Sequence, residues 1–165
     1  MTDVPAAGAP ASPATPPAKF VVWTEAMSVG RDNLDDRHKM IIDSLNRLHP
    51  LLGLSGRDAE VHAVIETLED FVLVHFSEEE QLLREVGYPD WRQHKEMHDA
   101  MYELVFKMKT DVEHGRTPDA QLVFAILNDW LVGHILGEDR KYIPYLNNPA
   151  PSPAPLWHRS NGRPF

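Results

Sequence analysis

The 165-residue chain contains no cysteine, which excludes disulfides, thiolate nucleophiles, iron–sulfur clusters and cysteine-type zinc sites. Basic residues are also scarce: the net charge is −9, the pI is about 5.4, and Lys and Arg are scattered along the chain. A nucleic-acid partner or an anionic membrane surface is therefore disfavoured. The first residues lack the basic and apolar segments of a signal peptide, and no apolar run approaches the roughly 20 residues that cross a bilayer. We expect a cytoplasmic protein without a membrane span.

Proline and small residues dominate both ends of the chain. Residues 1–18 contain almost no large apolar side chain, so they cannot bury enough surface to order themselves. Residues 147–165 are also rich in proline. We therefore interpret residues 1–18 as a disordered Pro/Ala-rich arm, residues 19–146 as a single domain, and residues 147–165 as a Pro-rich tail.

Between these ends, apolar residues repeat with the period of an amphipathic helix in four segments: 34–52, 61–86, 91–112 and 117–142. Glycine and proline fall mostly between the segments, where helices end and loops begin. Long helices joined by short loops pack as an all-α, antiparallel up-down-up-down four-helix bundle. Residues 20–30 precede the first helix as an N-terminal arm, and we expect its Phe20 and Trp23 to pack on the bundle.

Histidines and carboxylates lie at core-facing positions of all four segments: His38 on the first, His75 with Glu79 on the second, His94 with His98 on the third, and His134 with Asp139 on the fourth. Each pair alone is a weak signal, because His62 and Glu66 have the same spacing without this context. A single histidine on an apolar face is usually a neutral core residue with one hydrogen bond. The recurrence of the pattern on four helices predicts a metal site inside the bundle.

This many buried polar groups need partners, because an unpaired buried charge costs several kcal/mol or is neutralised by a shifted pKa. Metal coordination removes this cost, and residues four apart on a helix can face one centre. The donors exceed the roughly four to six that one first-row ion accepts, so we infer two ions. The imidazoles, two bridging carboxylates and a bridging hydroxide would leave one position open for a small diatomic ligand. The same donors would also accept zinc, manganese or cobalt.

The residues alone leave two questions unanswered: which carboxylate of the fourth segment faces the centre, and where the side chain of Arg37 points. Glu138 follows His134 by four residues and Asp139 follows it by five, and an α-helix favours the four-residue spacing for side chains on one face. Arg37 directly precedes His38, and we expect its guanidinium to point to solvent, since Arg is rarely buried without a partner.

Short motifs follow one another along the chain: Trp23 ahead of Val29-Gly30, Asp35-Asp36-Arg37-His38, His75-Phe76-Ser77-Glu78-Glu79, His94 with His98, and Trp130-Leu131 ahead of His134-Ile135 and Asp139. Their joint pattern resembles the hemerythrin family, in particular the bacterial hemerythrins, over about residues 20–146. Arg37 is a departure, because relatives often carry Gln at this position.

The resemblance implies a non-haem di-iron centre with an oxo or hydroxo bridge, whose ferrous form binds O2 as a ligand. It implies Glu79 and Asp139 as bridging carboxylates, and so favours Asp139 over Glu138. The full set of metal ligands it implies is His38, His75, Glu79, His94, His98, His134 and Asp139. It also implies an oxygen pocket lined by Phe76, Trp130, Leu131 and Ile135.

The expected function is reversible O2 binding for oxygen transport, storage or delivery, rather than catalysis. Neutral imidazoles dominate the donor set, whereas di-iron carboxylate enzymes use mostly Glu with Glu-x-x-His pairs. Two alternatives stay open: a sensor of O2 or redox state that signals through its ends, and a di-iron enzyme acting on peroxide, nitric oxide or ferrous iron. We expect a monomer, with a redox or oxygen-consuming protein as its partner.

Overall fold

The computed structural model describes residues 19–147, so the interpretations of residues 1–18 and 148–165 fall outside the described residues. Three long helices come first: α1 (Asp32–Leu48), α2 (Asp58–Glu85) and α3 (Trp91–Glu113). A fourth helical run, Ala120–Asn147, changes its winding along its length. It consists of α4 (Ala120–Asp129), a π-helix η3 (Trp130–Glu138), a 3-10 turn η4 (Asp139–Lys141) and α5 (Ile143–Asn147). Two further 3-10 turns flank α1: η1 (Glu25–Met27) and η2 (His49–Leu51).

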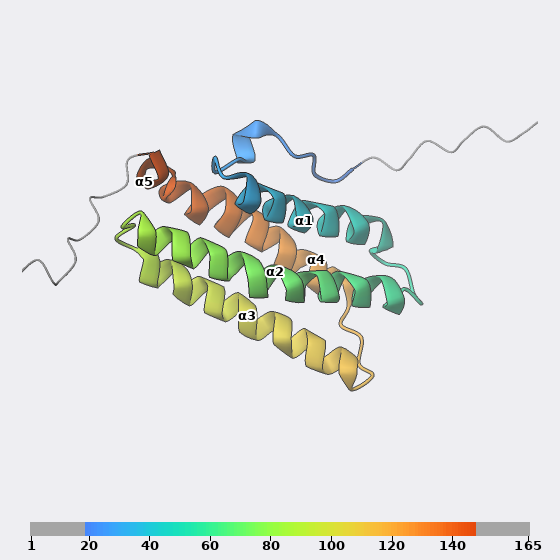
Figure 1. Cartoon of the computed structure of the whole chain (residues 1–165). Helices are drawn as coiled ribbons and strands as arrows, with labels where there is room; N and C mark the ends of the chain where they lie inside the picture. Colours follow the sequence, from blue (N-terminus) through green and yellow to red (C-terminus); the bar gives the residue numbers. More distant parts are fainter. Residues whose placement is uncertain (1–18, 148–165) are drawn as a thin grey trace, which may run out of the picture.

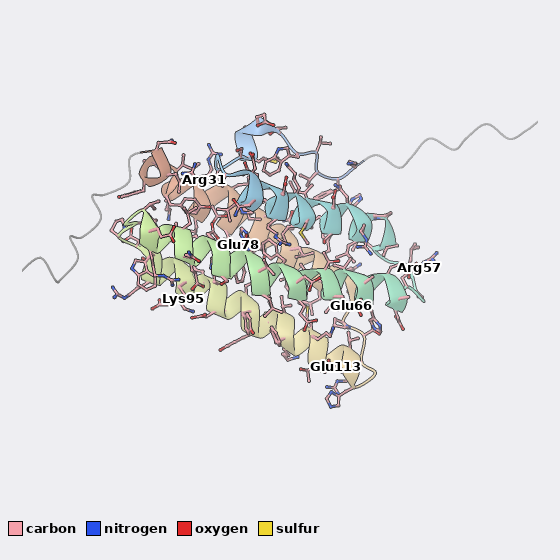
Figure 2. All side chains as sticks on the ribbon, viewed as in Figure 1. Arg31, Arg57, Glu66, Glu78, Lys95 and Glu113 are labelled. Carbon is pink, nitrogen blue, oxygen red and sulfur yellow. The ribbon has the colours of Figure 1, made fainter. Side chains whose placement is uncertain are left out.

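The four helical segments pack side by side as an antiparallel bundle (Figure 1). α2 packs against both α1 and α3, and α1 packs against α4. Charged side chains such as Arg57, Glu66 and Glu113 extend from the outer surface of the bundle (Figure 2). Residues 19–147 contain no strand. The predicted all-α, four-helix architecture is confirmed.

A glycine just after the end of α2 allows the chain to turn back toward α3. Gly87 has a φ of 71°, which costs glycine little because it has no Cβ. The chain folds back there, and the N–H of Tyr88 donates to the carbonyl of Leu83 at 2.9 Å. Gly115, with a φ of 73°, ends α3 in the same way. These two turns place α3 antiparallel to its neighbours. The buried His94 and His98 of α3 then lie beside Glu79 of α2.

The N-terminal arm lies against α1 and the fourth helical run (Figure 1). Asn46 on α1 binds the backbone of Val21 twice: its side-chain oxygen accepts from the N–H at 3.0 Å, and its side-chain nitrogen donates to the carbonyl at 2.8 Å. The ring of Phe20 stacks on His49 with 4.8 Å between centroids and meets Phe124 at 5.1 Å. The arm is therefore joined to the bundle by both polar and aromatic contacts.

Farther along the arm, Asp35 of α1 accepts hydrogen bonds from the Ser28 hydroxyl at 2.5 Å and the Val29 N–H at 2.8 Å. Trp23 is partly buried against the core, and Lys39 lies over its ring, 5.2 Å from the centroid. Both aromatic residues expected to pack on the bundle do so. The start of α1, which carries His38, is thereby held in place.

The apolar interior is divided into two clusters along the bundle. The larger includes Ile41, Leu45, Leu68, Phe71, Val105 and Leu127, and the smaller consists of Val29, Leu34, Leu83, Val86, Tyr88, Tyr142 and Leu146. The core-facing histidines and carboxylates lie between them. On α1, for example, His38 falls between Leu34 of the smaller cluster and Ile41 of the larger. A polar layer therefore crosses an otherwise apolar interior.

Within residues 19–147, the fourth helical run is the one helix that meets the length and composition of a membrane-spanning segment. Ala120–Asn147 spans 28 residues with a mean hydropathy of 1.3 in its most apolar window, so by length and composition alone it can cross a membrane. A core helix of a bundle meets the same criterion. In this run the buried His134 and Asp139 face histidines of α1 and α3. This segment is therefore a marginal candidate, and residues 19–147 contain no clear membrane span.

Replacing Asp119 with Ala should destabilise the protein by about 1 kcal/mol, because its carboxylate caps the start of α4. The carboxylate accepts from the N–H of Gln121 at 2.7 Å and of Leu122 at 3.3 Å. Urea denaturation measures the change. Glu66→Ala, at an exposed position of α2, is the control and should change the free energy of unfolding by less than about 0.5 kcal/mol. Equal stability of the two variants would contradict the capping role.

Candidate metal centre

The seven donors identified from the sequence lie together in the polar layer between the two apolar clusters. None has more than 3% of its surface exposed. Every helical segment contributes: α1 one histidine, α2 a histidine and a glutamate, α3 two histidines, and the fourth run a histidine on η3 and an aspartate on η4. The residues brought together are His38, His75, Glu79, His94, His98, His134 and Asp139.

Glu79 makes contacts with histidines of two helices. Its Oε2 atom is 3.3 Å from Nε2 of His75, 3.6 Å from Nε2 of His94 and 3.2 Å from Nε2 of His98. Its other oxygen, Oε1, accepts a hydrogen bond from the Tyr142 hydroxyl. The carboxylate thus lies between the imidazole on α2 and those on α3, which is the position that a bridging ligand requires.

Asp139 directs its two oxygens to different histidines. Oδ2 is 3.3 Å from Nε2 of His38, whereas Oδ1 is 3.2 Å from Nε2 of His134 and 3.5 Å from Nε2 of His94. One oxygen therefore faces α1, and the other faces α3 and η3. This carboxylate also has the geometry of a bridge.

The donor atoms fall into two groups that share Glu79. In the first group, one atom each from His38, His75 and Glu79 lies within 4.8 Å of the others. In the second group, the same holds for Glu79 and the three histidines His94, His98 and His134. Two such groups of nitrogen and oxygen donors fit two cations better than one.

The structure places Asp139, and not Glu138, among the donor histidines, and the π-helical winding of η3 accounts for this placement. In a π-helix the backbone hydrogen bonds run between residues five apart, so a residue five positions along the chain lies nearer the same face than it does in an α-helix. Here the N–H of Asp139 donates to the carbonyl of His134. His134 and Asp139 therefore share a face, and Asp139 is fully buried. Glu138 is turned away, and its carboxylate accepts from Lys141 Nζ at 2.6 and 2.7 Å. The four-residue spacing rule, which favoured Glu138, does not apply because this segment is not an α-helix.

The polar layer has more buried polar atoms than hydrogen bonds to satisfy them. Among the described residues, no hydrogen-bonding partner is present for either ring nitrogen of His38 or His75, for Nε2 of His94, or for either oxygen of Asp139. Each unsatisfied buried group costs about 1–3 kcal/mol. Because their lone pairs converge at separations near 3.2–3.6 Å, a pair of cations would satisfy them together. The residues present therefore fit a dinuclear metal site.

Burial and charge act in opposite directions on these groups. Burial lowers the pKa of His38 and His75, and it lowers the pKa of His134 to about 2. Neutral imidazoles keep the lone pair that a metal needs. Burial opposes ionisation of Glu79, but the neighbouring imidazoles of His75, His94 and His98 hold the pKa of this carboxyl well below its usual value. Burial, together with the charge of Glu79, raises the pKa of Asp139 well above its usual value.

Aromatic rings cover the three-histidine group. Phe76 stacks on His98 and Trp130 stacks on His134, each with 3.9 Å between ring centroids and interplanar angles of 6° and 15°. The other two residues expected near the centre, Leu131 and Ile135, are 2% and 0% exposed and belong to the larger apolar cluster. These contacts exclude water from one side of the polar layer.

Within the part of the chain that the structure describes, three cavities reach a donor histidine of the polar layer, and the smallest of them, of about 40 Å³, reaches His94. The other two have greater volumes. The larger, of about 580 Å³, lies between α3 and the fourth helical run and reaches His134; its lining is mainly apolar, with Met97, Ala100, Met101, Leu104, Ile126, Trp130 and Gly133 beside Asp129 and Glu138. The smaller, of about 210 Å³, lies between α2 and α3 and reaches His98 past Ser77, Glu80 and Lys95. The two approaches differ in polarity, and the apolar one is wider.

Sequence reasoning missed two polar contacts of the donors. Tyr142 is fully buried and donates to Glu79; its place three residues after Asp139 was the available signal. Glu80 has its Oε1 atom 3.4 Å from Nδ1 of His98, a contact between α2 and α3 that the spacing of residues within one helix does not predict. Burial lowers the pKa of His98, but hydrogen bonds to Glu79 and Glu80 outweigh it and raise this pKa to about 9.

Arg37, the residue that departs from the motif, is half-buried. Its guanidinium donates to the sulfur of Met40, 3.7 Å away on the same helix. Within residues 19–147 it makes no hydrogen bond or ion pair with the seven donors. The remaining described histidines lie apart from the centre: His62, for example, contacts the Thr117 hydroxyl at 2.8 Å.

Comparisons with known proteins agree with this geometry. The family model described as "Hemerythrin HHE cation binding domain" matches residues 29–146. A bacteriohemerythrin of Stenotrophomonas maltophilia is 34% identical, over 74% of this chain and 79% of the relative. A bacteriohemerythrin of Methylococcus capsulatus is 33% identical, over 78% of this chain and 98% of the relative. A crystal structure of wild-type hemerythrin is 31% identical and superposes with a TM-score of 0.67, over 77% of this chain and 98% of that chain. The chain belongs to the hemerythrin family.

Proposed function

We propose that this chain binds O2 reversibly at a di-iron centre held by the seven buried donors. The observation that carries the proposal is their division into a two-histidine and a three-histidine group, joined by carboxylates that contact both. Two ferrous ions held there would supply the electrons that O2 binding requires. The proposed ligands are His38 and His75 on one side, His94, His98 and His134 on the other, and Glu79 and Asp139 between them.

The unequal groups support a single exchangeable position. The group with His38 and His75 has one imidazole fewer than the other, so it leaves room for an external ligand. The imidazoles are neutral donors, which suit ferrous iron and reversible binding better than the anionic sets of di-iron oxygenases. All donors come from residues 38–139 of one chain, so a second copy is not needed to complete the centre.

The apolar surroundings support a neutral ligand. The larger cavity, between α3 and the fourth run, reaches the three-histidine group at His134 and not the group proposed to hold the open position. It bears on what can enter the polar layer, because an anion there would lose its hydration against Met97, Met101 and Leu104, whereas O2 has little hydration to lose. Leu131 and Ile135 are buried in the same apolar cluster as Phe76. We propose these three residues, together with Trp130, as the side chains that keep water from the O2 pocket.

The chain should contain two irons per monomer after expression with iron, and chelation should lower its melting temperature by at least about 10 °C. The reason is that metal binding satisfies the buried lone pairs and is therefore coupled to folding; even ~3 kcal/mol of binding energy shifts a domain of this size by roughly that amount. Iron analysis and thermal denaturation are the measurements. One ion per chain, or equal melting temperatures with and without metal, would contradict the centre.

Glu79→Ala should lose both irons, because the carboxylate serves both groups of histidines. Asp139→Ala should lose at least one, whereas Glu138→Ala should retain two, because Glu138 binds Lys141 instead of the histidines. Metal content of the three purified variants is compared. If Asp139→Ala kept both irons and Glu138→Ala lost iron, then Glu138 rather than Asp139 would be the ligand, which would contradict the arrangement described for η3.

Leu131→Ala should speed autoxidation of the reduced, oxygenated protein several-fold without changing its iron content. Removing this buried side chain opens space beside the centre, and water or anions that enter would displace the bound ligand. The absorption spectrum of the iron centre follows the reaction. Val132→Ala, at an exposed position one residue farther along η3, is the control and should autoxidise at the wild-type rate.

Repeated oxygenation separates the three candidate functions. A carrier should take up one O2 per di-iron centre and release it when oxygen is removed, through many cycles. Continuous consumption of peroxide, nitric oxide or ferrous iron would instead identify an enzyme. A change in the protease sensitivity of either chain end with iron oxidation state would identify a sensor, because that result requires the centre to bias a second structural element.

A further inference from the structure

His98 is a donor whose imidazole is held at both ring nitrogens. Its Nε2 faces the centre, 3.1 Å from Nε2 of His134, and its Nδ1 lies 3.4 Å from Oε1 of Glu80, at the long end of the hydrogen-bond range. The Nδ1 atoms of His38, His75 and His134, in contrast, have no hydrogen-bonding partner within the described residues. A carboxylate therefore lies behind one imidazole of the three-histidine group.

The position of Glu80 follows from helix geometry. Glu79 and Glu80 are neighbours on α2, and successive side chains on an α-helix point about 100° apart. Glu79 is therefore turned into the centre while Glu80 faces α3, the helix that carries His98. The Glu80 side chain is 14% exposed and lies at the boundary of the interior.

Surface cations lie near the Glu80 carboxylate. Arg84 Nη1 is 3.9 Å from Oε2, and Lys95 Nζ is 4.0 Å from Oε1 (Figure 2 labels Lys95 on α3). Lys95 also pairs with Asp99 on the same helix. An ionised carboxylate only accepts hydrogen bonds, so the ring nitrogen that faces Glu80 has to carry the hydrogen. When His98 is neutral, as a metal ligand must be, its lone pair then resides on Nε2, which faces the centre.

We propose that Glu80 is a positioning residue that holds His98 with Nδ1–H toward itself and Nε2 toward the metal pair, and that it strengthens His98 as a ligand. The inference rests on the proposed di-iron centre and concerns its three-histidine side. A carboxylate behind a metal-bound histidine fixes the ring and its tautomer, and its removal typically weakens metal binding by about 10- to 100-fold. Glu80 thus acts through His98 and does not touch the metal.

Cobalt(II) titration of the metal-free protein, followed by absorption, tests the proposal, because histidine and carboxylate donors accept cobalt. Glu80→Ala should bind one of two ions about 10- to 100-fold more weakly than the wild type. Glu80→Gln keeps an oxygen acceptor without the charge and should show an intermediate affinity. The control is Glu78→Gln, because Glu78 is exposed and its carboxylate accepts from Asn33 at 3.3 Å (Figure 2 labels Glu78 on α2). This control should bind cobalt like the wild type.

Thermal denaturation of the metal-free variants separates positioning from a general packing role. Glu80→Gln should melt within about 2 °C of Glu78→Gln, so that its weaker cobalt binding reflects the ligand alone. A metal-free Glu80→Gln that melts far below the control would assign Glu80 to packing and overturn the proposal. Wild-type cobalt affinity in Glu80→Ala, beside a wild type that binds two ions, would also overturn it while leaving the centre intact. A wild type that binds no cobalt would refute the proposed centre and the role of Glu80 together.

Discussion

The burial of seven polar donors between two apolar clusters is the constraint on which the rest of the structure depends. These side chains have 3% or less of their surface exposed, and many of their polar atoms have no hydrogen-bonding partner among the described residues. An arrangement of this kind is costly unless something satisfies the lone pairs. The two donor groups, with a carboxylate common to both, are suited to a pair of cations. Binding of a pair of cations would therefore be coupled to folding of the bundle.

The change of winding in the fourth helical run follows from the same constraint. A regular α-helix would direct Glu138, rather than Asp139, to the side of His134. The π-helical segment instead aligns residues five apart, and a 3-10 turn then brings Tyr142 inward, where its hydroxyl donates to Glu79. π-helical turns recur at functional sites for this reason: they re-aim side chains without breaking the helix.

The glycines of the π-helical segment do not have to be glycine for reasons of space. A Cβ at Gly137 would lie 3.5 Å from the carbonyl oxygen of Val132, which is an ordinary contact. A Cβ at Gly133 would have no neighbouring atom within 4 Å. Their effect is on propensity, because glycine disfavours a regular α-helix by about 1 kcal/mol relative to alanine. Two glycines within the nine residues of η3 therefore weaken the preference for α-helical winding in the segment that is wound as a π-helix.

Much of the fold was predictable because its signals are local. The apolar period located the helices, and the core-facing positions of His38, His75 and His98 located the donors that the structure brings together. The register of Asp139 was not derivable from spacing, because the α-helical rule assumes a winding that η3 does not have; the family resemblance supplied it. Contacts behind the donors, such as those of Tyr142 and Glu80, were missed because they depend on how helices pack.

Anomalous diffraction at the iron absorption edge would show whether two irons lie within the polar layer of the bundle. The account predicts two anomalous peaks between the four helices, one beside His38 and His75, the other beside His94, His98 and His134, with Glu79 and Asp139 in contact with both. A single peak, or iron bound only at the surface of the bundle, would contradict the account.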